Sequence, residues 1–136
     1  MGKGILFLCV ANSARSQMAE GIAKKLLPQR QIQSAGSKAT HVNLFAAKAL
    51  EEIGISTANH FSKSVESISP ETVGIVITLC AEEVCPIFLG HAEHHHWPFS
   101  DPAEVEGTDE EKIISFRNIR DQIHARLTEF FESEVH

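Results

Sequence analysis

The fold of this chain follows from one stretch, Gly4-Ile5-Leu6-Phe7-Leu8-Cys9-Val10-Ala11-Asn12-Ser13-Ala14-Arg15-Ser16. It opens with a continuous apolar run, which is typical of a strand buried in a parallel sheet. A helical pattern follows over residues 16–27, and Pro28 ends it. We therefore expect a strand, a tight loop and a helix in direct succession.

The loop between this strand and this helix carries residues suited to binding and attacking an anion. Its backbone N–H groups can converge on one point, and the helix N-terminus adds partial positive charge. Arg15 can bind two oxygens of a tetrahedral anion, and the same field would stabilise a Cys9 thiolate. We predict a cysteine nucleophile directed at a phosphate-shaped substrate, rather than a buried cysteine beside a surface arginine. The expected substrate-binding residues are Val10, Ala11, Asn12, Ser13, Ala14 and Arg15.

The rest of the chain alternates strand-like and helix-like segments. Strands are expected at 31–36, 73–79 and 95–99, and helices at 43–53 and 109–131. Thr108 and Glu111 can cap the last helix, whose apolar stripe is Phe116, Ile119, Ile123, Leu127 and Phe130. This alternation predicts a single α/β domain over residues 1–136, with a four-stranded parallel sheet and helices on both faces.

Composition excludes several classes of protein. No apolar run reaches the roughly 20 residues of a membrane span, and no secretory signal begins the chain. The net charge of −6 argues against nucleic acid as a partner. Three cysteines, an odd number, indicate reactive thiols in a reducing compartment rather than a disulfide framework. We therefore expect a cytoplasmic protein.

The motif that starts at Cys9 and ends at Ser16 resembles the signature loop of the low-molecular-weight protein tyrosine phosphatase fold. Its continuation to Glu20 is more similar to one branch of that fold, the thioredoxin-coupled arsenate reductases. The chain lacks tyrosine, which the phosphatases typically carry after their Asp-Pro pair. The resemblance continues through Ser34-Ala35-Gly36, Ile77-Thr78-Leu79-Cys80, Cys85-Pro86, His96-Trp97 and Asp101-Pro102.

This resemblance implies a function and a set of roles. Arsenate would be reduced to arsenite by Cys9 as nucleophile, with Asp101 as general acid. Cys80 would attack the arsenic adduct of Cys9, and Cys85 would then attack the disulfide between Cys9 and Cys80. Ser16 could donate its hydroxyl to the Cys9 thiolate or cap the helix. No bound cofactor is expected, and thioredoxin or a glutaredoxin-like dithiol protein would restore the thiols.

No metal is expected in this protein. Asn12, Glu20 and Ser34 match positions where some relatives bind potassium, but Lys63 replaces their aspartate, and its ammonium could occupy the place of the cation. The histidines at 91, 94, 95 and 96 suggest a metal cluster, but consecutive strand residues point to opposite faces. A polar histidine strand is the simpler interpretation.

Two alternatives stay open at this point. A phosphatase of the same fold needs only Cys9, Arg15 and Asp101, so weak phosphatase activity could accompany reduction. A non-catalytic thiol or metal sensor would use Cys80, Cys85 and the histidines. Such a sensor needs neither Arg15 nor Asp101, which argues against it.

Overall fold

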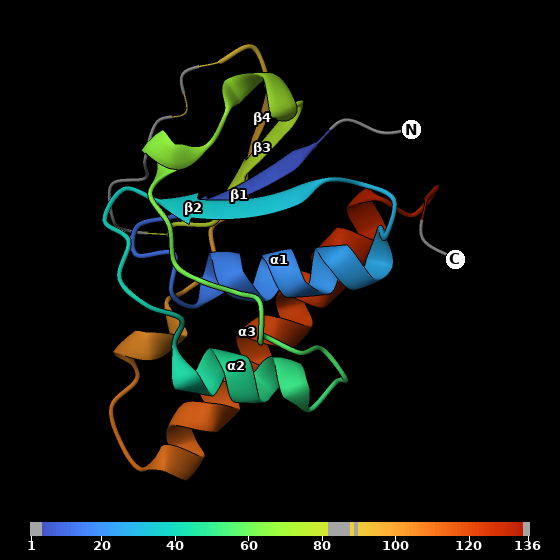
Figure 1. Cartoon of the computed structure of the whole chain (residues 1–136). Helices are drawn as coiled ribbons and strands as arrows, with labels where there is room; N and C mark the ends of the chain where they lie inside the picture. Colours follow the sequence, from blue (N-terminus) through green and yellow to red (C-terminus); the bar gives the residue numbers. More distant parts are fainter. Residues whose placement is uncertain (1–3, 82–87, 89, 135–136) are drawn as a thin grey trace.

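The computed structural model describes residues 4–81, 88 and 90–134, and a parallel sheet of four strands lies at its centre (Figure 1). The spatial order of the strands is β2-β1-β3-β4. Their bounds are β1 Ile5–Cys9, β2 Ile32–Gly36, β3 Ile75–Thr78 and β4 Glu93–His96. All five residues of β1 are buried, because this strand has a neighbour on each side and is covered on both faces. The predicted four-stranded parallel sheet is confirmed.

The carboxyl ends of β1 and β3 meet at one edge of the sheet. Leu8 of β1 pairs with Thr78 of β3, and the backbone N–H of Leu79 donates to the Leu8 carbonyl at 2.9 Å. Cys9 is the last residue of β1, and Cys80 lies two residues beyond the end of β3. In open parallel sheets this edge is where ligands bind.

The α-helices lie on one side of the sheet in Figure 1: α1 (Arg15–Leu26), α3 (Asp109–Phe130), and α2 (Leu44–Glu51), which packs against α1 and α3. The other face is covered by two 3₁₀-helices, η1 (Val65–Ser67) and η2 (Pro70–Thr72), together with Phe88. Helices are therefore found on both sides of the sheet as predicted, but the α-helices all lie on one side and the other side has short 3₁₀-helices. No helix within the described parts of the chain is long and apolar enough to cross a membrane.

Caps place the helices close to where the sequence predicts them. The Asn43 side chain accepts hydrogen bonds from the first turn of α2, and Gly54, at φ +81°, follows the end of that helix. Thr108 and Glu111 form the predicted capping box of α3. The predicted apolar stripe of α3 is buried except at Phe130, which is 37% exposed, whereas Phe131 is only 4% exposed. Phe131 leaves the helix as its C-cap residue and turns toward the core.

Strand β4 differs from the predicted strand at 95–99. It runs from Glu93 to His96, so it begins two residues earlier than predicted and ends before Pro98. Polar residues can form this strand because β4 lies at the edge of the sheet, where three of its four residues are exposed to solvent. After the strand, the N–H groups of Trp97 and Phe99 still donate to the carbonyls of Thr78 and Leu79.

Candidate active site

The loop between β1 and α1 is held from outside by its carbonyl oxygens. Each accepts a hydrogen bond from a neighbouring group: Val10 from Lys38 N (2.9 Å), Ala11 from Ser62 Oγ (2.9 Å), Asn12 from Gln17 Nε2 (3.1 Å) and Ser13 from Asn43 N (2.9 Å). The N–H of a trans peptide points away from its C=O. The N–H groups of residues 11–14 therefore face the interior of the loop, where they can bind an anion.

Two local features let the loop curl this tightly. Asn12 has φ 50°, and it is the one non-glycine residue with positive φ in the described part of the chain. Asparagine tolerates this left-handed region better than most residues. Gly36 supplies the space, because a Cβ there would lie 2.3 Å from the Val10 oxygen.

Helix α1 begins directly at this loop. Its N-cap is Ala14, and no side chain among the described residues caps it. The first N–H groups of the helix thus remain available to an anion, together with the positive end of the helix dipole. Ser16 lies inside the first turn, so the interpretation of Ser16 as the helix cap is wrong.

A buried chain of hydrogen bonds connects Cys9 to Glu20. Cys9 Sγ lies 2.8 Å from Ser16 Oγ, and Asn12 Nδ2 donates to both Ser16 Oγ (2.8 Å) and Ser34 Oγ (2.9 Å). Ser34 donates to Glu20, since an ionised carboxylate can only accept. Ser34 and Ser16 therefore both accept from Asn12, and the single hydrogen of Ser16 remains for the Cys9 sulfur. The network thus directs a donor at the sulfur, as a thiolate requires.

Glu20, the last group of this hydrogen-bond network, is ionised. Burial acts to raise the pKa of Glu20, but hydrogen bonds from Lys24 and Ser34 and the nearby ammonium of Lys63 outweigh burial and lower it. Lys24 Nζ lies 2.7 Å from Glu20 Oε2, and Lys63 Nζ lies 3.6 Å from Glu20 Oε1. The carboxylate that orients the network is therefore charged throughout the physiological range.

Glu20→Gln should lower the free energy of unfolding by about 1–2 kcal/mol at neutral pH. Because the pKa of Glu20 is lowered in the folded state, its contribution is present above the pKa of the unfolded chain and disappears as pH falls through the folded pKa. Urea unfolding at about pH 7 and about pH 3.5 measures this difference. The exposed Glu71→Gln is the matched control, and an equal deficit of Glu20→Gln at both pH values would contradict the assignment.

Arg15 and Asp101 come together at the open side of the loop. Arg15 is 4% exposed, and its Nη1 donates to the carbonyl of Phe99 at 2.9 Å. Its Nη2 lies 3.7 Å from Asp101 Oδ2. Asp101 Oδ1 accepts from Ala103 N at 2.9 Å and caps η3 (Pro102–Glu104), which leaves its carboxyl one-quarter exposed. The two predicted residues thus meet although 86 positions separate them (101 − 15).

The three cysteines differ in what the structure describes of them. Cys80 is fully buried beyond the end of β3 and is disulfide-bonded. Cys9 is a free cysteine and is 3% exposed. Cys85 lies outside the described residues.

The sequence patterns do not single out Gln17 and His60, which also lie in this region. Gln17 is completely buried and donates to Asn12 and to the carbonyl of Phe61, while its own oxygen lies 3.0 Å from His60 Nδ1. The sequence gives no local signal for Gln17, because its neighbours on the helical face are Glu20, Gly21 and Lys24. Its partners lie 43 and 44 positions away, which no local pattern reveals.

The histidines do not converge. The His95 ring packs against Phe130, whereas His96 Nδ1 lies 2.7 Å from Thr78 Oγ1, as alternation along a strand requires. Across the described residues, no three histidine, cysteine or acidic side chains are grouped as metal ligands. The absence of a metal stays a prediction.

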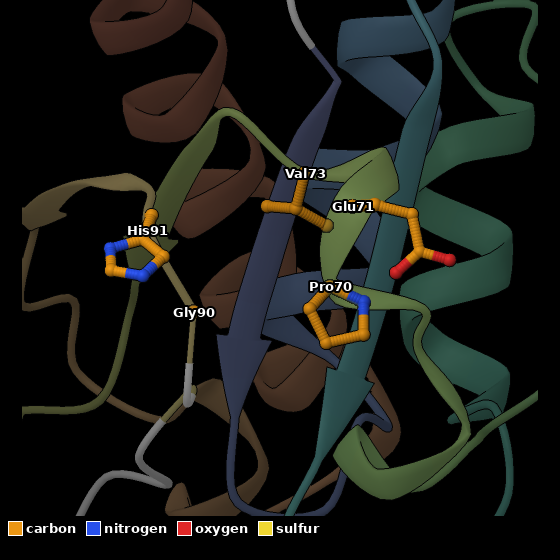
Figure 2. Close-up of a pocket in the computed structure, with 5 residues that line it drawn as sticks. All are labelled: Pro70, Glu71, Val73, Gly90 and His91. Atoms are coloured by element: carbon orange, nitrogen blue, oxygen red, sulfur yellow. The ribbon is translucent and has the colours of Figure 1, made fainter.

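A cavity of about 680 Å³ lies away from the anion loop. Its lining includes Pro70, Glu71, Val73, Gly90 and His91. Figure 2 shows the Glu71 carboxylate and the His91 ring on opposite sides of Pro70 and Val73, so they do not form a catalytic pair. The chemistry of the molecule is concentrated at the loop after β1.

Comparison with known proteins agrees with this geometry. The family model described as low molecular weight phosphotyrosine protein phosphatase matches residues 4–136. An arsenate reductase of Halalkalibacterium halodurans is 46% identical over 134 residues, which cover 96% of each chain. A solved arsenate reductase in the oxidized state superposes with a TM-score of 0.81 at 27% identity, over 97% of this chain and 98% of that one.

A more distant structure is similar in fold alone. The thioredoxin-dependent arsenate reductase of Corynebacterium glutamicum has a TM-score of 0.69 at 24% identity, over 96% of this chain and 61% of its own. The family model and the Halalkalibacterium relative each extend over almost the whole chain. The chain therefore belongs to the low molecular weight phosphotyrosine protein phosphatase family, in the group of its arsenate reductases.

Proposed function

We propose that this protein reduces arsenate to arsenite through a relay of three cysteines. The observation that carries the proposal is the anion loop itself, in which Ser16 donates to Cys9 and Arg15 reaches Asp101. Arsenate has the tetrahedral shape and the negative charge that inward-facing N–H groups and a guanidinium bind. The high identity to a named arsenate reductase supports the same substrate.

The first step is attack of the Cys9 thiolate on arsenic(V). A bond forms between Sγ and arsenic, and an arsenate oxygen leaves as water after Asp101 donates a proton to it. Arg15 and the N–H groups of the loop hold the remaining oxygens. This step is a substitution, so arsenic is not yet reduced.

Reduction accompanies the second step. The Cys80 thiolate attacks Cys9 Sγ, the disulfide between Cys9 and Cys80 forms, and the electron pair of the sulfur–arsenic bond stays on arsenic, which leaves as arsenite. Cys85 then attacks Cys80 and releases Cys9. The free Cys9 and the disulfide-bonded Cys80 correspond to the distribution that this relay predicts once the disulfide has left Cys9.

An external dithiol must return two electrons for each arsenate. Thioredoxin is the first candidate, because one fold neighbour is described as thioredoxin-dependent. A glutaredoxin-like protein is the second candidate. Both supply a thiolate that attacks an accessible disulfide, and such reductants work in a reducing compartment, which favours the cytoplasm.

The test is arsenate-dependent oxidation of NADPH in the presence of thioredoxin and its reductase. The same preparation is assayed for hydrolysis of an aryl phosphate. Phosphatase activity is the second candidate function, because Cys9, Arg15 and Asp101 also suit phosphoryl transfer. Reduction of arsenate well above the phosphatase rate supports the proposal, whereas aryl-phosphate hydrolysis without arsenate reduction would overturn it.

Lys63 provides a separate prediction about cations. Its ammonium lies beside Glu20 and 4.6 Å from the centre of the Phe61 ring, and its side chain is 18% exposed. If this ammonium replaces a bound cation, the melting temperature should be equal in potassium and in sodium at equal ionic strength.

The variant Lys63→Asp supplies an oxygen ligand in place of the ammonium and should acquire a melting temperature that is higher in potassium. Lys63→Ala is the control, because it removes the ammonium without adding a ligand. A specific potassium effect on the unmodified protein would contradict the assignment.

A further inference from the structure

Gln17, the third residue of α1, is fully buried beside the anion loop and uses every hydrogen-bonding group of its amide. Its Nε2 lies 3.1 Å from the Asn12 carbonyl oxygen, 3.1 Å from Asn12 Oδ1 and 3.0 Å from the Phe61 carbonyl oxygen. Its Oε1 lies 3.0 Å from His60 Nδ1. One side chain therefore joins the loop to the segment that follows α2.

The partners fix the direction of each of these bonds. Backbone carbonyls only accept, and Asn12 Oδ1 already accepts from Lys63 N at 2.9 Å, so Gln17 Nε2 must be the donor in each bond. The amide has two hydrogens for three oxygens, so one hydrogen is shared between two acceptors. Its Oε1 then accepts from His60, whose Nδ1 carries the hydrogen. Burial lowers the pKa of His60, which Glu20 partly offsets, so the ring is neutral at neutral pH.

The bond to the Asn12 carbonyl has a consequence inside the loop. Asn12 is held at φ 50°, and its C=O points toward Gln17. The following N–H, that of Ser13, belongs to the same planar peptide and points the opposite way, into the loop. Without the Gln17 donor this buried carbonyl would be unsatisfied, and rotation of the peptide would turn the Ser13 N–H away from the anion.

We propose that Gln17 is a positioning residue, which holds the Asn12–Ser13 peptide so that the Ser13 N–H faces the bound oxyanion. The inference rests on the proposed function only in requiring that the loop binds a tetrahedral oxyanion. His60 supports the same arrangement by satisfying the other end of the amide. Neither residue touches the reacting atoms.

The variant Gln17→Glu tests the proposal because it keeps the shape of the side chain and removes the donors. An ionised carboxylate would face three oxygens that can only accept, and this raises the pKa of the introduced carboxyl. At about pH 8 we expect inorganic phosphate to bind about tenfold to a hundredfold more weakly than to the unmodified protein. At about pH 5.5 the protonated carboxyl can donate one hydrogen bond, so part of the affinity should return.

Calorimetric titration with inorganic phosphate gives the ratio of affinities at each pH, so the titration of phosphate itself cancels. The other titratable groups around this amide are His60, Glu20, Lys24 and Lys63, and all are present in both proteins. Gln17→Met, which cannot donate at any pH, should bind weakly throughout. The exposed Gln122→Glu on α3 makes the same chemical change elsewhere and should bind phosphate as the unmodified protein does.

A further measurement needs no variant. In the unmodified protein, the amide proton of Ser13 should shift downfield in NMR spectra as phosphate is added. The proposal is overturned by a Gln17→Glu affinity within twofold of the unmodified value at about pH 8, by a deficit without recovery at low pH, or by a Ser13 amide that does not respond. Phosphate binding needs no turnover, so absence of arsenate reduction would count against the proposed function and not against this one.

Discussion

Cys9→Ser should abolish both arsenate reduction and aryl-phosphate hydrolysis, with rates lower by about 10³-fold or more. A serine hydroxyl stays protonated at neutral pH, so the same hydrogen bond from Ser16 and the same anion loop have no thiolate to present. Cys80→Ser and Cys85→Ser should each abolish repeated turnover of arsenate but not the hydrolysis of aryl phosphate. Phosphoryl transfer needs no second thiol, so both variants should keep the phosphatase activity of the unmodified protein.

The two resolving cysteines can be told apart by counting product. Cys85→Ser still forms the disulfide between Cys9 and Cys80, so it should release about one arsenite per protein molecule and then stop. Cys80→Ser should release none. These amounts are measured by rapid quenching and arsenite analysis without reductant. Full turnover of Cys85→Ser with thioredoxin would replace the relay by a scheme of two thiols and an external reductant.

Asp101→Asn should lower turnover by about 10²–10⁴-fold, the range that general acid catalysis contributes. Asparagine keeps the oxygen that accepts from Ala103 N, so η3 should keep its cap and the fold should be preserved. The ion pair with Arg15 is long, at 3.7 Å, and partly exposed, so its loss should change anion affinity little.

Single-turnover kinetics and phosphate titration separate these two effects of Asp101→Asn. Asp109→Asn, at the exposed start of α3, is the matched control. Unchanged turnover of Asp101→Asn would reduce Asp101 to a turn residue.

The elements that the sequence predicts well are those whose residues act on their neighbours. The apolar run before Cys9 forms the buried central strand, and the box of Thr108 and Glu111 starts α3 where expected. Asn12 adopts the left-handed backbone that its residue type allows. In each case the determining interaction lies within a few positions along the chain.

The misses depend on tertiary placement. Glu93 and His94 form a strand because they occupy the edge of the sheet, and their polarity concealed this. Phe131 rather than Phe130 reaches the core because the helix ends one residue early. Gln17 acquires its role from partners in a distant segment. Such contacts exist only after the chain has folded, so patterns along the sequence do not contain them.

Within the described residues, no side chain caps the N-terminus of helix α1, whose N-cap residue is Ala14. An oxyanion in the loop therefore completes the helix as a cap would, and its binding energy adds to the stability of the whole fold. Phosphate in a storage buffer would act both as a preservative and as a competitive inhibitor. Occupancy of the loop and stability against unfolding should therefore rise together. A high concentration of phosphate would stabilise this protein while slowing its reaction.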